Sequence, residues 1–350
     1  MTNAILRGKL DAGNPHVRFD EGEVASVKPR RGSLLYKITS KVFRLTSLVL
    51  SVALAGCSTS KEQEEHGTKV LMIGNSFSIC LLQHLPQVAA DRGVELDLAS
   101  LYIPGCSLKR HWENVEKDGD EGFKPYKFGR NRFGRYTQGK INVCDALRLA
   151  KWDIVTIQQA SGESWKPESY HPYGDKLIAK IRELAPQAKI IVQETWSYTP
   201  WDKRFAKWGI DQNEMYAKLH EVYGGFAKEK GLSVIPFGTA VQEWRRRLPV
   251  RYAENSFGGD VVGGRRQKPE EQFKRSVTNG WKPNCDVFHL NERGEYFQAL
   301  VWARTLFGVD LKDLKYKPDF VSDSDAKLMR EIAALPELNW NSESKPSGFR

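Results

Sequence analysis

Ser76, Asp286 and His289 are the residues whose types and spacing point most directly to chemistry. Ser76 ends a Gly-Asn-Ser run at 74–76, directly after the apolar residues 70–73. A serine hydroxyl becomes a nucleophile when a histidine nitrogen accepts its proton, and a carboxylate beside that histidine fixes the tautomer this requires. Asp286 lies three positions before His289, so its carboxylate can curl back onto the imidazole. The three residues therefore predict acyl transfer through a serine nucleophile.

The elements that must position these residues alternate between short apolar runs and helical stretches. Strands are predicted at 70–73, 94–101, 152–157, 188–192 and 232–235, and helices at 77–92, 174–185, 211–230 and 291–306. Strands separated by helices indicate a parallel sheet covered on both faces, since a parallel crossover needs a connection of helical length. We therefore predict an α/β fold, a three-layer αβα sandwich with a central parallel sheet. Ser76 then lies at the carboxyl edge of the sheet, where open α/β folds bind their ligands.

The order of these motifs resembles that of the SGNH/GDSL hydrolase superfamily, most closely a branch whose first block reads Gly-Asn-Ser. The resemblance covers roughly residues 69–308. It implies a flavodoxin-like sandwich of the SGNH hydrolase type. It also implies a catalytic triad in which Ser76 is the nucleophile, His289 the base and Asp286 the carboxylate that orients it.

The same resemblance implies an oxyanion hole formed by the N–H groups of Ser76 and Gly105 and by a side-chain amide. Family members usually carry that amide as Asn in a Gly-x-Asn-Asp motif after the third strand, whereas residues 157–161 read Ile-Gln-Gln-Ala-Ser. Gln159 offers the same amide one methylene further out, so we expect it to complete the hole, with Gln158 as second choice. One such donor contributes about 3 kcal/mol, so a misplaced amide predicts a slower enzyme rather than an inactive one.

Several further side chains are candidates for substrate binding. His111 follows the Gly105 loop, and Trp165, Trp196 and Trp201 lie on loops after the third and fourth strands, at the same edge as Ser76. We expect His111, Trp165 and Trp196 to line the site, with tryptophans stacking on sugar rings. A helix-surface position for His111 and a core position for Trp196 are equally compatible with the sequence. The run 245–247, Arg-Arg-Arg, is expected to be a solvated helix face, with contact to an acidic sugar as the alternative.

The N-terminus indicates export and a lipid anchor. Basic residues precede the apolar stretch 45–54, which is too short to span a bilayer and ends in Leu-Ala-Gly-Cys. This run resembles a bacterial lipobox, which makes Cys57 the expected lipidation site. We expect an extension and signal peptide at 1–57, a polar tether at 58–68 and a hydrolase domain at 69–350. The protein would then lie in the bacterial cell envelope, held on the outer membrane by acyl chains alone, facing the periplasm or the surface.

Composition and cysteine spacing argue against a nucleic-acid-binding protein and against a metal or cofactor site. The chain has 350 residues with 53 basic and 43 acidic side chains, and half of the excess charge lies in the first 56 residues, so we expect no nucleic-acid partner. No Cys-x-x-Cys or glycine-rich phosphate loop appears, and we expect neither a metal nor another cofactor. Cys80, Cys106, Cys144 and Cys285 allow three complete pairings, among which the sequence does not choose. We expect Cys106 and Cys285 to be the nearest pair, because they flank opposite sides of the predicted site, with four separate buried thiols as the alternative.

The sequence thus favours a serine hydrolase that cleaves an ester through an acyl-enzyme, with carbohydrate O-deacetylation leading. The expected partner is an ester-bearing glycan or another small acyl ester. Transfer of the acyl group to a sugar hydroxyl is one alternative, and a surface lipoprotein that binds glycan without catalysis is another. Two insertions interrupt the strand and helix alternation: residues near 124–140, which are expected to form a small hairpin or a lid, and residues near 245–284.

Overall fold

The computed structural model describes residues 67–247, 260–263 and 286–338, all within the unit His66–Arg350. Cys57, Cys285, the predicted signal peptide and most of the predicted 245–284 insertion lie outside the described residues. The expectation that Cys106 and Cys285 are the nearest pair of cysteines therefore stays a prediction. Within the described part of the chain, no helix has the length and apolar character needed to cross a membrane.

The centre of the fold is a seven-stranded, mostly parallel sheet in the order β4-β3-β2-β1-β5-β6-β7. Its strands are β1 (Thr68–Gly74), β2 (Leu96–Tyr102), β3 (Tyr126–Arg132), β4 (Arg135–Ile141), β5 (Ile154–Ile157), β6 (Lys189–Gln193) and β7 (Ser233–Ile235). Strands β2, β1, β5, β6 and β7 are parallel, while β3 and β4 extend the sheet antiparallel beyond β2. The parallel strands follow the flavodoxin-like order, in which the chain reverses its direction of winding at β1. The predicted stretch 124–140 is thus a hairpin that enlarges the sheet.

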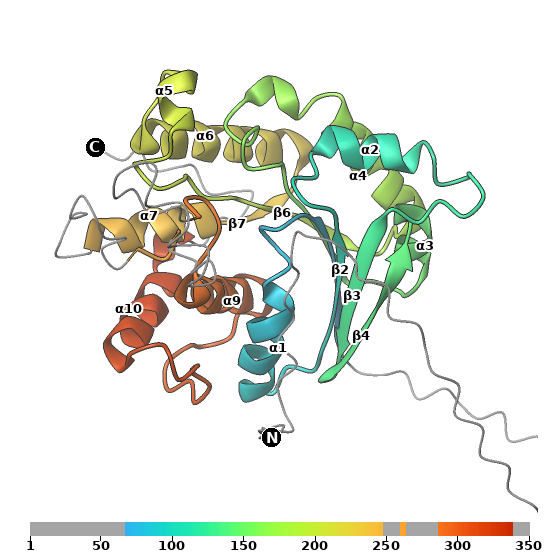
Figure 1. The fold of residues 1–350 in the computed structure, drawn as a ribbon. Helices are drawn as coiled ribbons and strands as arrows, with labels where there is room; N and C mark the ends of the chain where they lie inside the picture. Colours follow the sequence, from blue (N-terminus) through green and yellow to red (C-terminus); the bar gives the residue numbers. More distant parts are fainter. Residues whose placement is uncertain (1–66, 248–259, 264–285, 339–350) are drawn as a thin grey trace, which may run out of the picture. The chain divides into compact units, whose positions relative to one another are not determined.

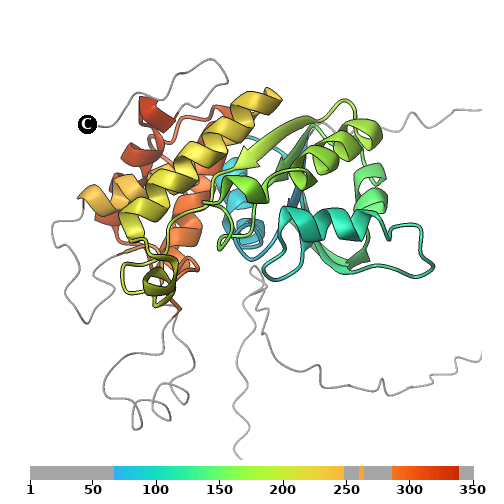
Figure 2. The same cartoon turned by 90° about the horizontal axis from the view of Figure 1, so that it is seen from above.

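Helices cover both faces of this sheet, which confirms the predicted sandwich. The helices are α1 (Leu81–Asp91), α2 (Leu108–Val115), α3 (Val143–Arg148), α4 (Tyr173–Leu184), α5 (Arg204–Trp208), α6 (Gln212–Lys230), α7 (Phe237–Arg247), α9 (Glu292–Phe307) and α10 (Asp323–Ala333), with short 3-10 turns at Pro167–Ser169 and Pro336–Leu338. Figure 1 shows α1 and α9 on one face and α2, α4 and α6 on the other. Figures 1 and 2 place α10, in red, at the end of the sheet opposite the β3-β4 hairpin.

The first helix begins later than the sequence predicts. Residues 77–80 form successive tight turns, in which the N–H of Ser78 donates to the carbonyl of Asn75 and that of Leu81 donates to Ser78. Helix α1 then starts at Leu81 instead of residue 77. Ser76 therefore lies on a turn between β1 and α1, at the carboxyl edge of β1.

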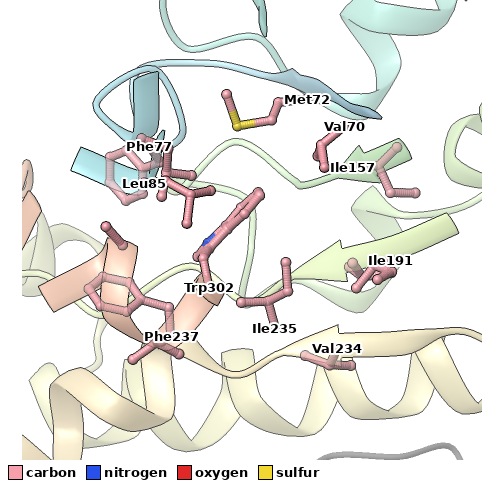
Figure 3. Close-up of a cluster of buried hydrophobic side chains, with 14 of the residues drawn as sticks. Val70, Met72, Phe77, Leu85, Ile157, Ile191, Val234, Ile235, Phe237 and Trp302 are labelled. Atoms are coloured by element: carbon pink, nitrogen blue, oxygen red, sulfur yellow. The ribbon is translucent and has the colours of Figure 1, made fainter. Parts of the chain in front are cut away.

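A continuous apolar core fixes the position of this turn. Figure 3 shows side chains of β1, β5, β6, β7 and α9 converging, among them Met72, Ile157 and Trp302, with Phe77 from the turn itself. Phe77 is fully buried. Burying a phenylalanine contributes about 1.5–3 kcal/mol, so the residue after Ser76 anchors the turn to the core.

Candidate active site

The structure brings Ser76, His289 and Asp286 into one hydrogen-bonded chain. Ser76 Oγ lies 2.8 Å from His289 Nε2, and His289 Nδ1 lies 2.6 Å from Asp286 Oδ2. Ser76 and His289 are 213 positions apart in the sequence, whereas Asp286 and His289 are three positions apart. The side chains of His289 and Asp286 are each 19% exposed, so the chain of groups is sheltered but reachable from solvent. In this geometry Nε2 is placed to accept the serine proton while the carboxylate holds the proton on Nδ1.

Asp286 performs two tasks with its two oxygens. Oδ1 accepts from the backbone N–H groups of Phe288 and His289, at 3.0 and 2.9 Å, which closes an Asx turn and sets the path of the His289 loop. Oδ2 accepts from the imidazole. Burial alone would raise the pKa of this carboxyl, but the hydrogen bond and charge of His289 and the two backbone donors lower the pKa to about 2. Asp286 is therefore ionised at any physiological pH.

Asn75 ties the Ser76 turn to the two neighbouring strands. Its Oδ1 accepts from the N–H of Phe77 at 3.0 Å and from Gln158 Nε2 at 2.7 Å. Its Nδ2 donates to the carbonyl of Cys106 at 3.0 Å. One fully buried amide thereby joins the ends of β1, β2 and β5. This supporting role of the middle residue in Gly-Asn-Ser is not evident from the sequence.

The carbonyl of Phe77 is held by two further buried amides. Gln193 at the end of β6 donates at 3.0 Å, and Gln298 on α9 donates at 2.8 Å. Gly74 explains how closely this turn is packed, since a Cβ there would collide with Ser78 Oγ and crowd the Gln158 amide. Ser76 thus sits on a turn fixed by side chains from several strands and a helix.

The His289 loop is fixed through three successive carbonyls. The carbonyl of Val287 accepts from the N–H of Thr199 at 3.0 Å. That of Phe288 accepts from Trp196 Nε1 at 2.8 Å, and that of His289 accepts from the N–H of Gly263 at 2.7 Å. The loop is therefore held from two sides, by residues 196–199 and by residues 260–263.

Two backbone N–H groups are available for an oxyanion. Among the described residues, neither the N–H of Ser76 nor that of Gly105 donates to a protein acceptor. Gly105 lies in a Pro-Gly turn closed by the Cys106 N–H and the Ile103 carbonyl, and its φ of +57° is the left-handed conformation that glycine adopts without strain. The Asn75 bond to Cys106 brings this turn to the Ser76 turn.

The structure does not place Gln159 as the sequence predicts. Its Nε2 donates to the carbonyl and hydroxyl of Ser169, at 2.8 and 3.0 Å, and its Oε1 accepts from the N–H groups of Leu108 and Ala160. The side chain is fully buried and its amide is committed to holding two loops together. Gln158 is the glutamine that faces the Ser76 turn, where it supports Asn75. We therefore no longer expect an oxyanion donor from Gln159.

Two of the residues predicted to bind substrate are core residues instead. Trp196 is 1% exposed and stacks on Phe77, with ring centroids 4.0 Å apart and planes inclined by 9°. His111 is fully buried, its Nδ1 lies 2.9 Å from the Tyr126 hydroxyl, and burial with the nearby Arg110 charge lowers its pKa to about 3. Neither side chain is accessible to a substrate. The prediction that these two side chains bind substrate is therefore wrong, and for Trp196 the alternative core position is the one observed.

The two other loop tryptophans are more accessible. Trp165 is half-buried and packs against Trp208, with the ring centroids 5.6 Å apart. Trp201 is 36% exposed. Both lie on loops that leave the carboxyl edge of the sheet, after β5 and β6.

Arg245 also departs from the sequence prediction. The run 245–247 ends helix α7, but the Arg245 side chain is only 3% exposed and pairs with the fully buried Asp260. Its neighbour Arg246 is 46% exposed, as expected for a solvated face. The partner of Arg245 lies 15 residues away in a segment without periodicity, so no local pattern could reveal the pair.

One cluster among the described residues has the composition of a metal site. Ligand atoms of His171, Asp175 and Glu229 lie within 4.8 Å of one another on the surface. The ammonium group of Lys230 contacts both carboxylates, at 2.5 and 2.7 Å, and so already supplies a positive charge there. In the ranges that the structure describes, none of the ion pairs of this cluster involves Ser76, Asp286 or His289.

Comparison with known proteins agrees with this architecture. A family model described as a domain of unknown function (DUF4886) matches residues 69–260. The crystal structure of a DUF4886 family protein from Bacteroides uniformis ATCC 8492 is 26% identical, with a TM-score of 0.63 over 76% of this chain and 93% of that one. No curated protein matches the sequence.

More distant similarities lie among SGNH/GDSL hydrolases. A lipolytic protein of the G-D-S-L family from Veillonella parvula DSM 2008 is 13% identical, with a TM-score of 0.38 over 69% of this chain and 100% of that one. A family 3 carbohydrate esterase from Clostridium thermocellum is 11% identical, with a TM-score of 0.37 over 68% and 94%. These two similarities concern the fold and carry no information on chemistry here. Because the family model spans more than half of the sequence, the chain belongs to the DUF4886 family.

Proposed function

We propose that this protein is a serine esterase that works through an acyl-enzyme. The observation that carries the proposal is the continuous chain from Ser76 Oγ through His289 to Asp286, with distances of 2.8 and 2.6 Å. Such a chain activates a hydroxyl that would otherwise remain protonated. Ser76 lies 213 positions from His289, and separate hydrogen bonds hold the turn that carries Ser76 and the loop that carries Asp286 and His289. This favours a functional arrangement over a chance contact.

In the proposed reaction, Ser76 Oγ attacks the ester carbonyl while its proton passes to His289 Nε2. The N–H groups of Ser76 and Gly105 bind the oxyanion of the tetrahedral intermediate, and Asp286 stabilises the imidazolium. His289 then returns the proton to the leaving alcohol, which leaves the acyl group on Ser76. Water attacks this acyl-enzyme with His289 as base and releases the carboxylic acid.

For the substrate we propose a small acyl group, such as acetyl, on a carbohydrate hydroxyl. The support is the exposed Trp201 and half-buried Trp165 on loops at the edge that carries Ser76, because aromatic rings stack on sugar faces. Trp196 no longer contributes to this support. We further propose that acyl chains on Cys57 hold the protein in the bacterial cell envelope, which would place it near glycan polymers.

A panel of acetylated, feruloylated and long-chain esters, assayed with wild type and Ser76→Ala, tests this function. We expect turnover of acetylated sugars that Ser76→Ala abolishes. Adding a glycan acceptor and analysing the products separates hydrolysis from acyl transfer. An absence of Ser76-dependent turnover on every ester in the panel contradicts the proposal.

A further inference from the structure

Arg245 has no role in the reaction proposed above, but its guanidinium contacts both segments that hold the His289 loop. Nη1 donates to the carbonyl and hydroxyl of Ser197, at 3.1 and 2.8 Å. Nε and Nη2 each lie 3.1 Å from Asp260 Oδ2. A buried charge is costly unless it is paired and hydrogen-bonded; the guanidinium is ion-paired with Asp260 and forms hydrogen bonds through Nε and Nη1.

The residues on one side of this fork, 196–199, bind the loop directly. Thr199 donates its N–H to the carbonyl of Val287, and Trp196 donates its indole N–H to that of Phe288. Ser197, which Arg245 holds, lies between these two donors. A shift of the Ser197 backbone would therefore move both of them.

The residues on the other side, 260–263, form what we call the strap. Gly263 donates its N–H to the carbonyl of His289, and Val262 forms a β-bridge with Leu290. Asp260, Val261 and Val262 are buried. The strap thus completes the set of three donors on the His289 loop.

Side chains at the start of α9 hold the strap by hydrogen bonds. Asn291 Nδ2 donates to the carbonyl of Asp260 at 2.7 Å and to that of Gly263 at 3.2 Å, while Asn291 Oδ1 caps the helix. Arg293 Nη2 donates to the same Asp260 carbonyl at 3.0 Å. A Cβ on Gly294 would collide with the Val261 carbonyl, so glycine permits the close approach.

From these contacts we infer that Arg245 is a positioning residue for His289, acting by joining the strap to residues 196–199 and so fixing the imidazole against Ser76. The inference rests on the proposed function for its kinetic meaning. Misplacing a catalytic group by about 1 Å lowers turnover about 100-fold. Loss of the Arg245 fork should therefore reduce kcat and leave KM unchanged, because neither Arg245 nor the strap is proposed to touch substrate.

The first test compares Arg245→Lys with Arg246→Lys. Lysine keeps the buried charge opposite Asp260 but presents a single ammonium that cannot reproduce the fork to Ser197 and Asp260. Arg246→Lys makes the same chemical change on the exposed neighbouring turn. We expect kcat to fall about 10- to 100-fold in Arg245→Lys with KM within twofold, and no change in Arg246→Lys.

A second variant keeps the test decisive if Arg245→Lys fails to fold. Asn291→Ser retains a good helix cap but removes both donors to the strap. Asn142→Ser is its matched control, because Asn142 caps α3 and its described side-chain hydrogen bond is to the N–H of Asp145 and not to the strap. We expect Asn291→Ser, like Arg245→Lys, to lower kcat at constant KM, with Asn142→Ser at the wild-type value.

A readout independent of turnover separates this inference from the proposed function. The proton between His289 Nδ1 and Asp286 should give a downfield NMR resonance, assigned by its loss in His289→Ala. We expect this resonance to shift or broaden in Arg245→Lys and Asn291→Ser. If wild type hydrolyses no ester, the proposed function fails and this resonance alone decides the positioning role. A folded Arg245→Lys or Asn291→Ser protein with wild-type kcat, where there is turnover, and an unchanged resonance overturns the inference.

Discussion

Replacing Asp286 by asparagine should abolish most of the activity through the tautomer of His289. Asp286 Oδ1 accepts from two backbone N–H groups, at 3.0 and 2.9 Å, and the asparagine side chain would keep its carbonyl oxygen there. Its NH2 group would then face His289 Nδ1, at the position where Oδ2 now lies 2.6 Å away. An NH2 group donates, so the imidazole would have to present its lone pair at Nδ1 and carry its proton on Nε2.

A protonated Nε2 cannot accept the proton of Ser76. For this exchange of tautomer we expect kcat to fall about 10⁴-fold, which corresponds to about 5 kcal/mol of transition-state free energy. The fold should survive, because the Asx turn is retained. The free energy of unfolding at pH 7 should fall by about 2 kcal/mol, since that is the value of a pKa lowered from 3.8 to about 2.

The assay is the initial rate of p-nitrophenyl acetate hydrolysis, with urea unfolding measured on the same samples. Asp323→Asn serves as the control, since the Asp323 side chain is 96% exposed and lies on α10. We expect wild-type rates from the control. A folded Asp286→Asn protein that keeps more than about a tenth of wild-type kcat would refute the tautomer argument.

Three further predictions concern stability, packing and location. The pKa of Asp286 is lowered in the folded protein, so its ionised form stabilises the fold above the pKa of the unfolded chain. Urea titrations should show this contribution of about 2 kcal/mol disappearing as the pH falls from 3.8 through about 2. The Asp286→Asn variant should not show this loss. Trp196→Phe removes the indole donor to Phe288 and should cost about 1 kcal/mol of stability with KM unchanged, whereas a raised KM would place Trp196 in contact with substrate. Cys57→Ala should move the protein from the membrane fraction to the soluble one or leave its signal peptide uncleaved, and normal processing with retained membrane binding would contradict the lipobox interpretation.

The architecture was predictable because its signals are local. Apolar runs of strand length alternate with helices, so the parallel sheet and the edge that carries Ser76 follow from the sequence alone. The Asp286 and His289 pair is predictable for the same reason, since three positions suffice for an Asx turn and a side-chain bond. The antiparallel placement of β3 and β4 beside β2 was not predictable, because strand pairing depends on contacts between distant residues.

The errors at the site have a common physical cause, which is that burial depends on long-range packing. Gln158 and Gln159 are adjacent after a strand, and neighbouring residues point to opposite sides, so a difference of one position decides which amide faces Ser76. Trp196 on a loop reads the same whether it stacks on Phe77 or lies in solvent. The basic run that contains Arg245 indicates a solvated helix face. Arg245 is buried instead because it pairs with Asp260 in the strap, which the sequence does not reveal.

The most direct test of the account is the site of reaction with a fluorophosphonate, which modifies only a serine that is activated as a nucleophile. We expect mass spectrometry to find one adduct, on Ser76, that disappears in Ser76→Ala and His289→Ala. Ser78→Ala is the matched control two residues away, because the Ser78 hydroxyl donates to the Asn75 carbonyl and is buried. That variant should label as wild type does. Labelling that persists in Ser76→Ala, or an adduct on another serine, would contradict the assignment of Ser76 as the nucleophile.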